Sequence, residues 1–203
     1  MQNNSPTFPQ LFASNQDSSI TTSANNGFDD TIYFYKQSEV PYGVFSNFPF
    51  FKIVIDDEEW NSSEIYFQAK KFEGTEHEAI LKAAETSKEA AQLGRDPSRP
   101  LRADWNASMD FSKLPNSSEA YYLSSLWNKY VGRPMLVKDY YMLIAVLAKF
   151  TQHPELRSLL IDTGKALIVE HTEKDNYWAD GGDGTGENIL GRILMIAREI
   201  LSN

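Results

Sequence analysis

The strongest constraint on the fold is a series of helix-start signals in which Ser, Thr or Asn precedes a Glu by three residues. In such a capping box the first side chain accepts a hydrogen bond from a first-turn N–H, and the Glu bonds back. Pro134 and Pro154, each at a predicted first helical position, begin two further helices that end near Phe150 and Gly164. The four boxes are Asn61-Ser-Ser-Glu64, Thr75-x-x-Glu78, Thr86-x-x-Glu89 and Asn116-x-x-Glu119, and a last amphipathic helix is expected from about Asn188 to Leu201.

Strand-forming sequence is scarce by comparison. Residues 31–35, 50–55 and 166–170 are rich in β-formers, and an acidic turn after the second segment predicts a short hairpin with Glu59-Trp60. Few strands among many helices, without βαβ alternation, predict a single, predominantly helical α+β domain. We expect it to span residues 30–203. Residues 1–29 are predicted to form a disordered tail, because Asn, Ser, Thr and Gln dominate them.

Composition excludes several classes of protein. The chain has no cysteine, which excludes disulfide scaffolds, thiol catalysis and Cys-ligated metals. A net charge of −9 argues against a surface that binds bulk nucleic acid, although a small basic pocket remains possible. No apolar run approaches the ~18–20 residues of a membrane span, and the first basic residue is Lys36. We therefore expect a cytoplasmic protein without membrane contact, the nucleus being left open.

The helix that begins at Asn61 carries a polar stripe. Glu64, Gln68 and Lys71 follow one another at i, i+4 and i+7, so they share one face of the helix. The plain interpretation is a solvated face, with Glu64 serving only as the capping residue. The functional interpretation is a pocket on which a carboxylate, an amide and an ammonium converge.

A glycine-rich segment, residues 175–188, leads into the last helix. Its glycines predict exposed backbone N–H groups at the positive end of a helix, an arrangement that suits a phosphate. Tyr177 and Trp178 are placed to stack on a heterocycle. The alternatives are a flexible loop or a calcium site, although the EF-hand pattern is not met.

Arg95, Arg99 and Arg102 form the densest basic cluster of this acidic chain. Such a cluster suits an anionic ligand, and pairing with Asp96 and Asp104 is the equally good alternative. The three histidines are scattered without metal-ligand spacing, so no metal site is expected.

From Thr31 onward the chain resembles the NADAR family (named for NAD and ADP-ribose), also called YbiA-like proteins. Two departures accompany the resemblance: extra sequence at about residues 106–135, which we interpret as an added helix, and Ala179, where the family usually has Gly. The matching stretches are Phe45-Ser-Asn-Phe48, Ser63-Glu-Ile-Tyr-Phe-Gln-Ala-Lys-Lys-Phe72, Gly94-Arg-Asp96, Leu101-Arg-x-x-Trp105, Ala148-Lys-Phe150, Leu167-Ile-Val-Glu-His-Thr172, Asp175-x-Tyr-Trp178 and Gly184-x-Gly-x-Asn-x-Leu-Gly191 followed by Leu194-Met195.

The resemblance implies an N-glycosidase that needs no cofactor and no metal. Relatives cleave ribose phosphate from heterocycles of early riboflavin intermediates, or remove ADP-ribose from guanine. Removal of ADP-ribose from guanine is the expected activity for this chain, because its N-terminal extension and insertion depart from the compact bacterial form. Carried over to this sequence, the resemblance implies Glu64 and Asp180 as catalytic carboxylates. The substrate-binding residues it implies are Asn47, Phe48, Gln68, Lys71, Arg95, Trp105, Trp178, Gly184 and Asn188.

The expected partner is a nucleotide-like small molecule, with an ADP-ribosylated nucleic-acid base as a further option. Two rival functions stay open at this point. A non-catalytic reader of ADP-ribose would use the arginines and tryptophans but not Glu64. A helical interaction domain would use residues 106–135 as its surface.

Overall fold

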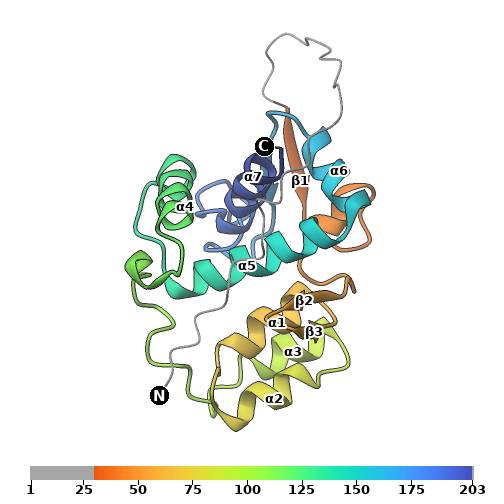
Figure 1. Ribbon diagram of the computed structural model, residues 1–203. Coiled ribbons are helices and arrows are strands. Elements are labelled where there is room, and N and C mark those ends of the chain that lie inside the picture. Colours follow the sequence, from red (N-terminus) through yellow and green to blue (C-terminus); the bar gives the residue numbers. More distant parts are fainter. Residues whose placement is uncertain (1–29, 203) are drawn as a thin grey trace.

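The computed structural model describes residues 30–202, so the predicted tail lies outside the described residues. One long helix, α5 (Val137–Gln152), crosses the middle of the molecule (Figure 1). Every residue from Asp139 to Phe150 is buried, as expected of a helix that is covered on all sides. Most of the other elements pack either on α5 itself or on the elements that contact it.

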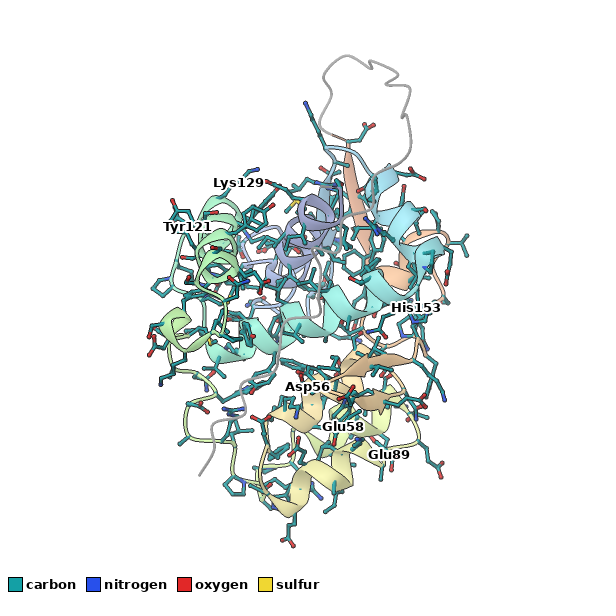
Figure 2. The ribbon with its side chains drawn as sticks, viewed as in Figure 1. Asp56, Glu58, Glu89, Tyr121, Lys129 and His153 are labelled. Atoms are coloured by element: carbon teal, nitrogen blue, oxygen red, sulfur yellow. The ribbon has the colours of Figure 1, made fainter. Side chains whose placement is uncertain are left out.

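Two groups of elements lie on either side of α5 (Figure 1). The first group is α1 (Ser63–Lys70), α2 (Glu76–Lys82), α3 (Ser87–Leu93), β2 (Ile53–Ile55) and β3 (Glu58–Trp60). The second group is β1 (Thr31–Phe34), α4 (Ser117–Tyr130), α6 (Pro154–Asp162), β4 (Leu167–Glu170) and α7 (Ile189–Ser202). Short 3-10 helices, η1 (Tyr42–Phe45) and η2 (Phe111–Lys113), complete the described elements. On α4, Tyr121 points outward, whereas the ammonium of Lys129 reaches Glu199 of α7 at 2.6 Å (Figure 2).

The strands form two separate pairs. β1 and β4 run parallel, with Thr31 opposite Leu167 and Phe34 opposite Glu170. β2 and β3 form an antiparallel hairpin whose turn residues, Asp56 and Asp57, both have positive φ angles (54° and 62°), as a tight two-residue hairpin turn requires. The predicted α+β class, helical with few short strands, is confirmed.

The local helix signals were accurate at most starts. Thr75, Thr86 and Asn116 are the N-caps of α2, α3 and α4, and each side chain accepts a first-turn N–H. Pro154 is the first residue of α6. The predicted start at Pro134 is wrong. Helix α5 begins at Val137 instead. The Asp139 carboxylate accepts the Leu136 N–H at 2.9 Å, and this hydrogen bond fixes Leu136 as the N-cap.

The first capping box also needs correction. Ser62, not Asn61, is the N-cap of α1, and its hydroxyl accepts the Ile65 N–H at 3.1 Å. Glu64 is consequently the second helical residue, and the capping position at the third is Ile65. The carboxylate is therefore free of the capping role and available for other contacts. Of the helices that the structure describes, none is long and apolar enough to cross a membrane.

Candidate active site

The polar stripe on α1 is enclosed rather than solvated. Glu64 and Gln68 are 6% and 5% exposed, and the Gln68 amide donates to Glu64 Oε1 at 2.8 Å. The Glu64 N–H donates to the backbone carbonyl of Asn47, which anchors the start of the helix. Within residues 30–202, no hydrogen bond or ion pair engages the other Glu64 oxygen. This carboxylate is thus held in place with one oxygen left for a ligand.

Two cations act on this carboxylate. Burial raises the pKa of Glu64, whereas the hydrogen bond from Gln68 and the charges of Lys71 and Arg95 oppose that rise. Burial also lowers the pKa of Lys71 to about 8; the charge of Glu64 opposes this, and those of Arg95 and Lys138 reinforce it. The site therefore combines one buried acid with several neighbouring positive charges.

Gln68 is wedged against Gly94 and has an unused acceptor. A Cβ atom at Gly94 would lie 1.9 Å from Gln68 Oε1, so only glycine leaves room for this orientation of the amide. The Lys71 ammonium donates to the Gly94 carbonyl at 3.3 Å, from the other side of the same turn. Gln68 Oε1 is buried without a partner. An unpaired buried acceptor is costly, and the packing against Gly94 leaves Gln68 Oε1 no open surface.

The arginine cluster divides into paired and unpaired members. Arg99 forms an ion pair with Asp96 at 2.5 Å. Arg102 is paired with Glu73 and Asp104. Arg95 is exposed and has no ion-pair partner among the described residues. Pairing with nearby acids was thus the right interpretation for two of the three arginines, and Arg95 alone stays available beside Glu64.

The glycine-rich loop folds around Asp180. The Asp180 carboxylate accepts the Gly182 N–H at 2.9 Å and the Thr172 N–H at 3.3 Å, and its second oxygen lies 2.8 Å from His171 Nδ1. Its backbone carbonyl accepts the N–H groups of Gly184 and Gly186. Together these contacts fix the path of the loop. They also hold the pKa of Asp180 below its usual value, because the hydrogen bonds outweigh the effect of burial.

The expected phosphate cradle is not formed at this loop. The N–H groups of Asn188, Ile189 and Leu190, at the start of α7, donate to the carbonyls of residues 179, 177 and 178. The Asn188 side chain accepts the Glu170 N–H at 3.0 Å and donates to the Ile168 carbonyl at 2.9 Å. The helix N-terminus and Asn188 therefore hold β4 and the loop together. Gly184 is exposed, with open space around it.

The aromatic residues separate into a partly exposed ring and its supports. Trp178 is partly exposed and meets Phe67 edge to face, with ring centroids 5.2 Å apart. Trp105 is only 4% exposed and stacks on Tyr141, with centroids 6.0 Å apart. Tyr177 is fixed by its hydroxyl, which donates to Asp139 at 2.5 Å. Trp178 is thus the ring available for stacking, and the contacts of Trp105 favour a supporting role.

Asn47 and Phe48 lie beside the start of α1. The Asn47 amide donates to Met142 Sδ at 3.0 Å and accepts from the Ser63 hydroxyl at 3.2 Å. Phe48 is partly buried, and its carbonyl accepts from the Ser87 hydroxyl at 2.8 Å. Both residues therefore shape the site, while the polar groups of Asn47 are used within the protein.

Two residues that sequence reasoning missed belong to the same region. Lys138 interacts electrostatically with Lys71, and its ammonium lies 3.6 Å from the Tyr177 ring centroid. Glu170, the last residue of β4, is partly buried, and its charge interacts with that of Glu64. Glu170 stood inside a stretch that carries the family resemblance, a signal that could have identified it. Lys138 gave no such signal, because only the packing of α5 places it here.

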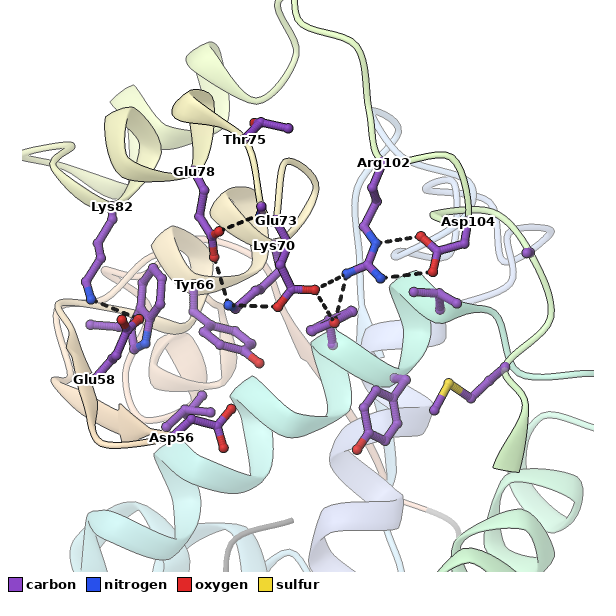
Figure 3. Close-up of a pocket in the computed structure, with 18 of the residues that line it drawn as sticks. Asp56, Glu58, Tyr66, Lys70, Glu73, Thr75, Glu78, Lys82, Arg102 and Asp104 are labelled. Carbon is purple, nitrogen blue, oxygen red and sulfur yellow. Dashed lines mark hydrogen bonds and ion pairs between the residues drawn. The ribbon is translucent and has the colours of Figure 1, made fainter. Parts of the chain in front are cut away.

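A separate cavity of about 1130 Å³ opens on the other side of α1 (Figure 3). Its charged groups are largely paired with one another: Lys70 bonds Glu73 and Glu78, and Arg102 bonds Glu73 and Asp104. Of the residues that the sequence analysis considered for ligand binding, only Arg102 lines it, and neither predicted catalytic carboxylate does. The described residues contain no cluster of three or more His, Asp or Glu side chains that could hold a metal ion.

Comparison with known proteins identifies the family of this chain. The NADAR domain family matches residues 33–202. The N-glycosidase YbiA of Escherichia coli is 40% identical over 174 residues, which cover 86% of this chain and 90% of that protein. An N-glycosidase of Nostoc punctiforme is 39% identical, with 85% and 94% coverage. The solved structure of E. coli YbiA superposes with a TM-score of 0.66 over 86% of each chain.

A more distant similarity concerns a longer protein. A riboflavin biosynthesis protein of Vibrio vulnificus is 32% identical over 177 residues. The match covers 87% of this chain but 40% of that protein.

Proposed function

The chain belongs to the NADAR domain family, and we propose on that basis that it hydrolyses the C–N bond between a phosphate-bearing ribosyl group and an N-heterocycle. The 40% identity to an N-glycosidase over most of both chains makes the protein a hydrolase of N-glycosyl bonds. The observation that carries the site assignment is the buried carboxylate of Glu64, oriented by Gln68 and flanked by Lys71 and Arg95.

Cleavage of an N-ribosyl bond develops positive charge on the sugar. The transition state resembles an oxocarbenium ion, and a fixed anion beside C1′ stabilises it electrostatically. Glu64 supplies that anion, and its free oxygen accepts a proton from the attacking water. The nearby positive charges favour its ionised form, and Gln68 fixes its direction.

The remaining residues divide into substrate contacts and supports. Lys71, Arg95 and Lys138 supply positive charge for the phosphate, and Trp178 offers a ring to the heterocycle. The contacts of Asp180 and Asn188 favour a positioning role, since their polar atoms are used inside the protein. This revises the expectation that Asp180 acts directly on the substrate.

Two substrate classes fit this arrangement. ADP-ribose on guanine, free or at a nucleic-acid end, is the class that the sequence analysis placed first. A ribosylated riboflavin intermediate gains support from the name of the V. vulnificus relative. Both carry a phosphate near the ribose, which the three cations would bind. Incubation of the purified protein with each substrate, followed by mass spectrometry of the released base, distinguishes the two.

The test of the catalytic assignment is Glu64→Gln, which keeps the shape of the side chain and removes its charge. We expect kcat to fall about 10²–10⁴-fold, the usual contribution of a positioned acid–base group. Glu76→Gln, an exposed residue in the first turn of α2, is the matched control and should retain full activity. A folded Glu64→Gln protein with near wild-type turnover would exclude this role. Wild-type protein that binds but never cleaves either substrate would identify a reader module instead.

A further inference from the structure

A second acidic side chain, Glu170, interacts electrostatically with Glu64. It ends β4 and is partly buried, and within residues 30–202 no hydrogen bond or ion pair engages its carboxyl group. The charges of Asp175, Glu64 and Asp180 all act on it. Asp175 accepts the N–H groups of residues 177 and 178, and Asp180 accepts those of the loop. Among these acidic residues, Glu170 is thus one whose carboxyl group forms no hydrogen bond or ion pair with the described residues.

The main chain of Glu170 is clamped on every side. Its N–H donates to the Asn188 side chain at 3.0 Å, and its carbonyl accepts the Asp180 N–H at 2.9 Å. On the other edge it pairs with Phe34 of β1. Asn188 and Asp180, which sequence reasoning assigned to the substrate, therefore both hold Glu170 in position. A fixed main chain that carries a side chain without internal partners is typical of a group that acts on a ligand.

We propose that Glu170 is the general acid that protonates the departing heterocycle, an inference that rests on the proposed N-glycosidase function. As the C1′–N bond breaks, its electron pair passes to the nitrogen, which takes the proton of Glu170. A water oxygen bonds C1′ and gives its proton to Glu64. One water is consumed, and the sugar hydroxyl and the protonated base leave.

The environments of the two carboxyl groups fit these opposite roles. Burial raises the pKa of Glu64, but its amide donor Gln68 and the cations Lys71 and Arg95 oppose that rise and favour the ionised form. Burial and the three neighbouring carboxylates raise the pKa of Glu170 to about 8, so it keeps its proton at neutral pH. Paired carboxyl groups whose environments separate their pKa values divide into acid and base in this way.

The first test uses the wild-type protein and two leaving groups. With an N-heterocyclic substrate, kcat should fall as the pH rises through about 8, because the acid loses its proton. With a nitrophenyl riboside 5′-phosphate, whose leaving group departs without protonation, that alkaline fall should be absent. An identical alkaline fall in kcat for both substrates would overturn the proposal.

The second test compares Glu170→Gln with Glu173→Gln, an exposed neighbour of the same length. We expect Glu170→Gln to lower kcat about 10²–10⁴-fold on the N-heterocyclic substrate and to leave turnover of the nitrophenyl riboside nearly unchanged. Glu173→Gln should match the wild type on both. Equal losses on both substrates, or no loss on either, would refute the acid role while leaving the N-glycosidase function intact. Wild-type protein that releases no base at all would instead refute the proposed function itself.

Discussion

Gly94 offers a direct test of whether the orientation of Gln68 matters for the chemistry. A Cβ at this position would lie 1.9 Å from Gln68 Oε1, whereas ordinary contact begins at 3.4 Å, so the amide must move by the difference, about 1.5 Å. The backbone itself accepts alanine, because φ at Gly94 is −73°. The nearest atom is the end of a flexible side chain, and the backbone carbonyl of Ala90 would lie 3.2 Å away, so we expect Gly94→Ala to fold with a modest loss of stability.

The substitution should instead lower the catalytic rate. A displaced Gln68 amide no longer holds Glu64 Oε1, and a misplacement of about 1 Å can cost on the order of 10²-fold in rate. We therefore expect kcat of Gly94→Ala to fall about 10²-fold, with a melting temperature within a few degrees of wild type. Steady-state kinetics and thermal unfolding measure the two quantities separately.

A control with the opposite signature is available at Gly74. This glycine has a φ of +78°, and a Cβ atom there would have no neighbour within 4 Å, so alanine meets backbone strain but no clash. Gly74→Ala should lose about 1–2 kcal/mol of stability and keep full turnover. If Gly94→Ala also kept full turnover, the argument that Gln68 orients the catalytic carboxylate would fail.

Two further predictions concern pH. Lys71, with a pKa lowered to about 8, loses its charge above that pH, so KM for a phosphorylated substrate should rise there. The variant Lys71→Arg should move this rise in KM to higher pH. A rise in KM that persists with an unphosphorylated riboside would contradict the assignment of Lys71 to the phosphate. Lys149 is buried and donates to the carbonyls of Val44 and Ser46, and burial lowers its pKa to about 7. The unfolded chain therefore binds the extra proton between about pH 7 and the ordinary lysine pKa, so the free energy of unfolding should increase with pH across that window. Urea titrations of wild type and Lys149→Met should show a difference that grows from about pH 7 toward the ordinary lysine pKa, and a constant difference would contradict it.

Local features of the fold were readable from the sequence because local hydrogen bonds determine them. The caps at Thr75, Thr86 and Asn116 depend on residues two or three positions away, so spacing alone predicts them. The start at Pro134 failed for a related reason. A better cap, formed between Leu136 and Asp139, competed with it a few residues later.

The site could be predicted only where its members share one helix. Glu64, Gln68 and Lys71 lie on one face of α1 because helical periodicity requires it. Whether that face is solvated or buried depends on what packs over it, and the contact with Gly94 decided this. The family resemblance located the further residues but not their contacts.

The sequence by itself determined the helical α+β class and the polar stripe of α1, which depend on neighbours along the chain, and the family, which depends on the order of short motifs. Only the tertiary structure decided which charges remain unpaired. It paired Arg99 and Arg102 with acids, turned Asp180 and Asn188 toward the main chain, and left the carboxyl group of Glu170 without a partner among the described residues. The physical reason is that a polar side chain takes whichever partner packing brings within reach, and the spacing of residues along the chain does not specify that partner.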